Sequence, residues 1–390
     1  MKPSKLFDDF FHSEKAGGLI LIFCTIISLV LANSVFGKSY IHLFETELSG
    51  STIEHWINDG LMAIFFLLIG LELKREFVAG ELSNIKNALL PAFGALGGML
   101  VPAGIYLLLN FRTSTQGGAG IPMATDIAFA IGVLSLLGNK IPTSLKVFLT
   151  ALAVIDDLGA IVVIALFYSK TIYWSYLIAS LGIFLALLIL NRLKVNKLFI
   201  YLLGGFFMWY FMLHSGIHAT IAGVLLAFVI PHDYSPETSS PAEFLEEILH
   251  KPVAFLIMPI FALANTAFII DVSITNLFKE TYAMGICLGL IIGKPLGIFI
   301  FSFIGVKLKF CDLGEGMNWL SVIGVGLLGG IGFTMSIFIA LLAFDDFTLI
   351  SNSKLAILSS SLVAGGLGYL FLHIGAKINS KKDNEIANSN

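Results

Sequence analysis

The chain has 390 residues, of which 57% are hydrophobic and only 13% are charged. A soluble domain carries about 25% charged residues, so this composition excludes a soluble globular protein and indicates a polytopic membrane protein. The formal net charge of −3 argues against nucleic acid as a partner.

The hydropathy pattern predicts an all-α membrane fold of about twelve transmembrane helices, within one domain at residues 1–378. Seventeen of the 23 Lys and Arg residues fall in segments that would be cytoplasmic, and five fall in outside loops. The positive-inside rule therefore places both termini in the cytoplasm. The polar tail at 379–390 is expected to be disordered. The expected spans are 16–36, 58–73, 88–110, 121–137, 147–168, 172–191, 197–213, 216–231, 252–270, 282–306, 319–344 and 354–375.

Ionisable residues occur at several predicted span ends on or near the membrane surface. Glu72, Lys74, Arg75 and Glu76 close the second span, and Glu246 precedes the ninth on the same side. They form either a solvated helix end or a cytoplasmic mouth that collects cations. His218 begins the eighth span and is either a structural histidine or a pH sensor, because its ordinary pKa lies near neutrality.

Two predicted spans carry residues that favour a break in the helix. The fourth is short and has Gly118, Gly120 and Pro122 just before Asp126. The eleventh has five glycines within nine residues, from position 324 to 332. Unwound backbone at membrane depth must line a cavity or be buried in protein. Asp126 is either a cap of the apolar helix that follows it or part of an ion site.

The two broken spans occupy corresponding places in two three-span groups, spans 3–5 and 10–12. Seven steps separate span 3 from span 10, so the two groups enter the membrane from opposite sides and form an inverted repeat. Paired broken helices at such positions are a sequence pointer to a transporter site. The predicted core is therefore residues 88–168 and 282–375, and the remaining helices form the rest of the domain.

Asp156 and Asp157 are the only charged residues between positions 147 and 168. Each carboxylate at that depth costs roughly 2.5–3.5 kcal/mol on insertion scales, so a cation, a proton or a charged partner must stabilise it. The single basic residue in the interior of a span, away from its ends, is Lys294, followed directly by Pro295. Because adjacent helix positions point about 100° apart, one acid can face the lysine while the other faces a cavity.

Three functional classes could use this cluster. A cation–proton exchanger needs a carboxylate that binds either H⁺ or Na⁺. An intramembrane aspartyl protease needs acids on two facing helices and commonly a G-x-G-D run, which the sequence lacks. A retinal protein would use Lys294 as its Schiff base, but the predicted twelve spans and Pro295 fit this class poorly.

Five strings of the sequence, in this order, closely resemble the bacterial Na⁺/H⁺ antiporters of the NhaA type. They are FFLLIGLELKRE, PMATDIAFAIG, LAVIDDLGAI, HSGIHATIAG and IIGKPLGI. Antiporters of this type are a known case of inverted-repeat transporters with discontinuous helices. The resemblance covers about residues 5–378 and implies a secondary active, electrogenic, pH-regulated antiporter of the bacterial inner membrane rather than an enzyme. It also implies Na⁺, Li⁺ and H⁺ as cargo, no cofactor, and a homodimer.

The resemblance implies a role for each matching residue. Asp157 would be the central cation ligand and Asp156 the partner of Lys294, which can itself carry a proton. Asp126 would offset the charged ends of the half-helices and join the ion site with Thr125. The residues implied in the pH response are Glu72, Arg75, Glu76, His218 and Glu246. In the family the first outside loop can carry a β-hairpin that joins two protomers, and here this loop is short.

Overall fold

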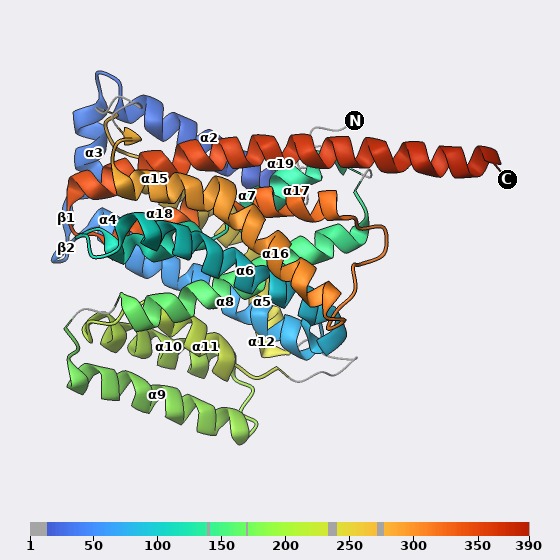
Figure 1. Ribbon diagram of the computed structural model, residues 1–390. Helices are drawn as coiled ribbons and strands as arrows, with labels where there is room; N and C mark the ends of the chain where they lie inside the picture. The colour runs from blue at the N-terminus through green and yellow to red at the C-terminus, as the bar shows by residue number, and fades with distance from the viewer. Residues whose placement is uncertain (1–13, 139–140, 169–170, 233–239, 271–276, 390) are drawn as a thin grey trace, which may run out of the picture. The chain divides into compact units, whose positions relative to one another are not determined.

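The computed structural model describes residues 14–138, 141–168, 171–232, 240–270 and 277–389, and it is almost entirely helical (Figure 1). Within these residues, eight helices are long and apolar enough to cross a membrane, or ten if each of two bent helix pairs counts as one span. The prediction of an all-α polytopic membrane protein is therefore confirmed. The number twelve stays a prediction, because two of the expected ranges contain helices below span length.

Those two shorter helices are α10, Leu198–Leu213, and α11, Ile221–Val229, with 16 and nine residues. Between them the chain leaves helical geometry, and Gly216 adopts a φ of +82° that other residues rarely take. Pro231 follows soon after the end of α11 and cannot continue an α-helix ladder. Both helices nevertheless pack with α9, Trp174–Arg192, around a shared apolar core.

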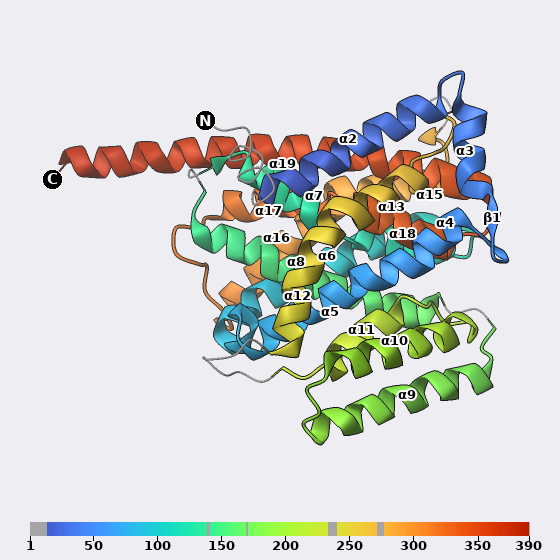
Figure 2. The same cartoon turned by 180° about the vertical axis from the view of Figure 1, so that it is seen from behind.

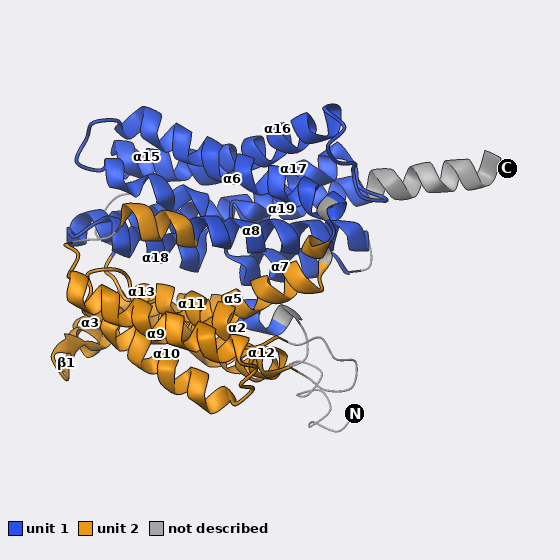
Figure 3. Cartoon of the chain, turned by 90° about the horizontal axis from the view of Figure 1, so that it is seen from below, with its two compact units in different colours: residues 1–19, 84–160, 270–390 blue, residues 20–83, 161–269 orange. Residues whose placement is uncertain are grey.

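The chain divides into two compact units, each assembled from separated stretches of sequence (Figure 3). Unit 1 comprises residues 1–19, 84–160 and 270–390, and unit 2 comprises residues 20–83 and 161–269. The predicted core ranges 88–168 and 282–375 overlap unit 1. They differ in two ways, because the last turns of α8, Thr143–Phe167, belong to unit 2 and residues 1–19 belong to unit 1.

Unit 1 contains both broken spans and the helices on either side of them. Its elements are α6 Ile85–Asn110, a 3₁₀ helix Gln116–Met123, α7 Ile127–Ser135, most of α8, α15 Thr281–Leu288, a π turn Gly289–Gly293, α16 Lys294–Lys307, α17 Trp319–Gly329, α18 Phe333–Ala343 and α19 Phe347–Ser389. Helices α6 and α16 cross at Gly97 and Gly297. A Cβ at either glycine would overlap the backbone of the other, so only glycine permits this approach.

Unit 2 is built around α5, Met62–Val78, which packs against α11 and α12 (Figure 2). Its other elements are α2 Glu14–Ala32 from residue 20 on, α3 Gly37–Glu45, β1 Glu47–Leu48, β2 Ser51–Thr52, α4 Ile53–Trp56, a π turn Ile57–Leu61, a 3₁₀ turn Glu81–Ser83, the end of α8, α9, α10, α11, α12 Pro241–Pro252, a π turn Val253–Ile257 and α13 Met258–Asn265. The strands form an antiparallel hairpin that pairs Glu47 with Thr52, so the short loop expected to lie outside does contain a small hairpin.

The last helix, α19, is longer than its predicted span. It packs against α15 and α17 within unit 1 and continues to Ser389, through the stretch expected to be a disordered tail (Figure 1). Residues 377–389 contain no glycine or proline, so nothing in them stops a helix. The final residue of the predicted tail, Asn390, lies outside the described residues.

Candidate functional site

The two broken spans meet inside unit 1. Residues 124–126 are extended between the 3₁₀ helix and α7, and residues 330–332 separate α17 from α18 at a bend of 48°. The Asp126 N–H donates to the Ile331 carbonyl at 2.6 Å, and the Thr125 hydroxyl donates to the Gly329 carbonyl at 2.9 Å. Each break thus supplies partners for backbone groups that the other exposes, as membrane burial requires.

Asp126 joins the N-termini of two half-helices. It caps α7, because its Oδ1 accepts the N–H of Phe129 at 3.1 Å. Its Oδ2 accepts the N–H of Thr334, in the first turn of α18, at 3.2 Å, and also the Thr334 hydroxyl. Since helix N-termini carry partial positive charge, one buried carboxylate offsets two of them. Both carboxylate oxygens of Asp126 are occupied in this way.

Asp156 and Lys294 form a fully buried ion pair between α8 and α16. Lys294 Nζ lies 2.5 Å from Asp156 Oδ2, and both side chains are 0% exposed. The Thr125 hydroxyl also donates to Asp156 Oδ2, at 2.7 Å. A hydroxyl has one proton, so Thr125 donates either to Asp156 or to Gly329 at a given moment.

The same site contains one carboxylate oxygen with unused capacity and a second buried acid. Asp156 Oδ1 is buried and makes no hydrogen bond within the described residues. Asp157, the next residue on α8, is 1% exposed. A carboxylate oxygen buried without a donor is unfavourable unless a proton or a cation reaches it. Two adjacent acids and a hydroxyl therefore supply hard oxygen ligands that suit an alkali cation.

Sequence reasoning missed Thr334, which lies 208 positions from its partner Asp126. Thr334→Val keeps the shape of the side chain but removes a donor to a buried carboxylate. The expected loss of stability is about 1–3 kcal/mol. Thermal unfolding of the purified protein measures it as a lower Tm, and Thr334→Ser, which keeps the hydroxyl, is the matched control. A valine variant as stable as the serine variant would contradict this role of Thr334.

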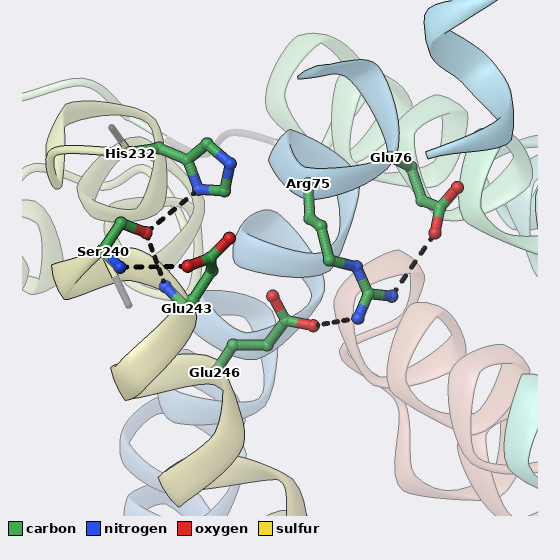
Figure 4. A network of polar contacts seen from close by, with 6 residues as sticks. All are labelled: Arg75, Glu76, His232, Ser240, Glu243 and Glu246. Carbon is green, nitrogen blue, oxygen red and sulfur yellow. Dashed lines mark hydrogen bonds and ion pairs between the residues drawn. The ribbon is translucent and has the colours of Figure 1, made fainter. Parts of the chain in front are cut away.

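A second ionisable cluster lies in unit 2, between α5 and α12 (Figure 4). Arg75 contacts Glu246 Oε1 at 2.8 Å and Glu76 Oε1 at 3.3 Å, and Glu246 is only 8% exposed. Glu72, one turn before Glu76, is close enough to interact electrostatically with these three residues. The structure therefore brings together four of the five residues expected to take part in a pH response.

The helix that carries Glu246 has a well-formed N-terminus. Ser240 and Glu243 make a reciprocal capping box at the start of α12, with the Glu243 N–H donating to the Ser240 hydroxyl at 3.2 Å (Figure 4). His232 Nδ1 lies 3.4 Å from the same hydroxyl. The cap fixes the first turn of α12, which places Glu246 one turn later beside Arg75.

The fifth residue of that set, His218, has a different environment. Its Nε2 lies 2.8 Å from the carbonyl oxygen of Tyr168. Lys74, expected at a solvated helix end or a cation-collecting mouth, makes contacts that the sequence did not predict. Its Nζ lies 3.0 Å from the Phe228 carbonyl and 2.5 Å from that of Ile230. Lys74 thereby caps the C-terminus of α11, where a positive charge is favourable.

Comparison with known proteins gives matches along nearly the whole chain. The family model for Na⁺/H⁺ antiporter 1 matches residues 8–372. The Na⁺/H⁺ antiporter NhaA of Flavobacterium psychrophilum is 63% identical over 372 residues, which are 95% of this chain and 97% of that protein. The antiporters of the same name from Cytophaga hutchinsonii and Dechloromonas aromatica are 59% and 56% identical, over 97% and 95% of this chain and 97% and 96% of theirs.

These relatives are transporters, and each aligns with this chain from near one end to near the other. The match includes the region of Asp156, Asp157, Lys294 and both helix breaks. The chain therefore belongs to the NhaA family of Na⁺/H⁺ antiporters and exchanges Na⁺ for H⁺ across a membrane.

Proposed function

We propose that Na⁺ and protons compete for Asp156 and Asp157, and that this competition couples the outward movement of Na⁺ to the inward movement of H⁺. The observation that supports the proposal best is the buried pair of Asp156 with Lys294, in which the second carboxylate oxygen of Asp156 has no donor within the described residues. A site of this kind is stable with a proton or with a cation, but two buried positive charges cannot share it.

In the proposed cycle, Na⁺ reaches the cytoplasm-facing site and displaces the proton of Asp157. Asp156 then exchanges its contact with Lys294 for a contact with Na⁺, and Lys294, no longer paired, sheds a proton. The hydroxyl of Thr125 can turn from Asp156 to the Gly329 carbonyl while its lone pairs face the cation. Asp126 would stay at the two helix ends, since both its oxygens accept hydrogen bonds there.

The proposed exchange is electrogenic, because more than one proton leaves the site for each Na⁺ that enters. Li⁺ is a second expected cargo, since it is also a hard monovalent cation that prefers oxygen ligands. Na⁺ and Li⁺ are here the transported substrates, so the chain needs no resident cofactor for this cycle.

Alternating access would arise from movement of the helices at 88–168 and 282–375 as one body. The inverted repeat of spans 3–5 and 10–12 supports this idea, since both broken spans occur in unit 1 and hydrogen-bond to each other. We further propose a location in the bacterial inner membrane with both termini in the cytoplasm. The hairpin Glu47–Thr52 is a candidate contact of a homodimer, although two residues in each strand make it a small one.

The cluster at Arg75 is proposed to adjust exchange to cytoplasmic pH. The Arg75 guanidinium favours the charged form of Glu246, so Arg75→Gln should make this carboxyl easier to protonate. Activation of exchange is then expected to move by about 0.5–1 pH unit toward alkaline pH, less than for a fully buried pair because Arg75 is half exposed. Proton movement in everted vesicles between pH 6.5 and 9 measures the profile.

Arg75→Lys keeps the positive charge and is the matched control for that change. A profile for Arg75→Gln that coincides with those of the wild type and the lysine variant would remove the cluster from the pH response.

The proposed function as a whole is tested in a salt-sensitive bacterium that lacks its own exchangers. The chain should restore growth on Na⁺ and Li⁺ plates, more strongly at alkaline pH, and vesicles from these cells should release protons when Na⁺ is added. Growth without Na⁺-dependent proton release would contradict the coupling.

A further inference from the structure

A π-helical turn directly precedes Lys294 in unit 1. It spans Gly289–Gly293, and the N–H of Lys294 donates to the carbonyl of Gly289, five residues back. An α-helix would use the carbonyl of Leu290, four residues back. Single π turns inside α-helices are uncommon and occur frequently at functional sites. The turn at Gly289–Gly293 lies directly before Lys294, whose side chain pairs with Asp156.

The local sequence explains why the turn forms here. In a regular α-helix the ring of Pro295 would clash with the carbonyl of Ile291, four residues back, and the wider π turn relieves this clash. Two glycines of the turn also pack closely against prolines of other segments. A Cβ at Gly293 would lie 2.8 Å from Pro102 Cα, and one at Gly289 would lie 2.6 Å from Pro122 Cβ.

In an α-helix the Leu290 carbonyl would accept the N–H of Lys294. Here this carbonyl faces the break in the eleventh span instead. A Cβ built on Gly330 would overlap the carbonyl oxygen of Leu290. Gly330 is the first residue of the break between α17 and α18, next to Gly329, which accepts the hydroxyl of Thr125. The turn therefore touches the segment that hydrogen-bonds to Thr125, which is also a partner of Asp156.

Changing a π turn into an α turn shifts the helical register by one residue. The side chains beyond it then rotate by about 100° relative to those before it. Lys294 Nζ lies 2.5 Å from Asp156 Oδ2 with the π turn present. A rotation of that size cannot keep this contact.

We propose that the π turn at Gly289–Gly293 aims Lys294 at Asp156, and that its closure into an α-helix releases Asp156 to bind the cation. This inference rests on the proposed competition at Asp156 and Asp157. Pro102, Gly289, Gly293 and Pro295 are positioning residues, because they act on the ion site only through Lys294. Closure also withdraws the Leu290 carbonyl from Gly330, so loading of the site is transmitted to the broken span.

Pro295→Ala tests the proposal, because alanine removes the ring that would clash with the Ile291 carbonyl in an α turn and so favours closure. A larger share of the protein would then have Asp156 released, and the apparent KM for Na⁺ at pH 7 should fall by about threefold or more. The pH profile of exchange in everted vesicles should extend to more acidic pH. Pro91→Ala, which removes another proline from within a helix of the same unit, is the control and should change neither quantity.

The same substitution in a Lys294→Ala background separates positioning from general damage. Without Lys294 the turn has no side chain to aim, so Pro295→Ala should no longer change the KM for Na⁺. An unchanged KM in the single variant, or an equal change in both backgrounds, would overturn the proposal. Failure of the ion site itself would be visible separately, as exchange that survives Asp157→Asn.

A measurement on the wild-type protein covers the case in which Pro295→Ala does not fold. Amide hydrogen exchange of a peptide covering residues 286–299 should slow when Na⁺ replaces choline at one alkaline pH, because an α turn protects its amides better than a π turn. Identical exchange in the two salts would overturn the proposed closure.

Discussion

Asp157→Asn is expected to abolish Na⁺-dependent proton release from everted vesicles, down to the signal of vesicles without the antiporter. An asparagine amide has no negative charge to offset Na⁺ and no proton to exchange for it, so neither half of the cycle can proceed. The side chain is buried beside Asp156 and keeps its size, so the variant should fold and insert normally.

A matched substitution of an exposed aspartate by asparagine is the control for that result. Asp312→Asn changes an exposed residue between α16 and α17 and should leave exchange unchanged. Normal Na⁺-dependent proton release by Asp157→Asn would mean that Asp157 does not bind the transported ion.

Lys294→Ala is expected to have the largest effect on stability. It leaves the Asp156 carboxylate buried without its cation, and breaking a buried pair in this way costs about 3–5 kcal/mol. Thermal unfolding in detergent at pH 8.5 should show a clearly lower Tm than the wild type. The loss should be smaller at pH 6, where Asp156 in the variant can take up a proton in place of the lysine.

Lys294→Arg keeps a positive charge in the pair and should retain more stability than the alanine variant. If Lys294→Ala unfolds at the wild-type temperature at both pH values, the contact between Lys294 and Asp156 contributes nothing to the fold.

The sequence was sufficient to find the charged residues at the centre of the site. Buried charges are so unfavourable in a spanning helix that Asp156, Asp157 and Lys294 stand out among apolar neighbours. The structure pairs Lys294 with Asp156, the partner that the family resemblance implied. The glycines around positions 120 and 330 lie next to residues 124–126 and 330–332, where the backbone leaves helical geometry.

Contacts between distant positions could not be predicted in this way. Thr334 reaches Asp126 across 208 positions, and Lys74 reaches the end of α11 across more than 150. Neither residue type signals its partner, because threonine is common in apolar helices and a lysine at a span end usually faces water. Lys354, one of the five basic residues counted in outside loops, lies within α19 and is 6% exposed.

Local backbone geometry was the second feature that the sequence did not predict. The prediction of a span at 216–231 rested on hydropathy, which does not register that the chain before Ile221 is not helical. The π turn before Lys294 packs against prolines 102 and 122, which come from a different helix and a 3₁₀ segment. Hydropathy identifies apolar stretches, whereas helix type and length depend on what packs against them.

Equilibrium binding of ²²Na⁺ to the purified protein at several pH values tests the competition at Asp156 and Asp157 most directly. If one proton must leave for each Na⁺ that binds, the apparent Kd should rise about tenfold for each unit by which pH falls, and more steeply if two protons leave. Asp157→Asn should bind no measurable Na⁺. A Kd that does not depend on pH, or wild-type binding by Asp157→Asn, would contradict the account.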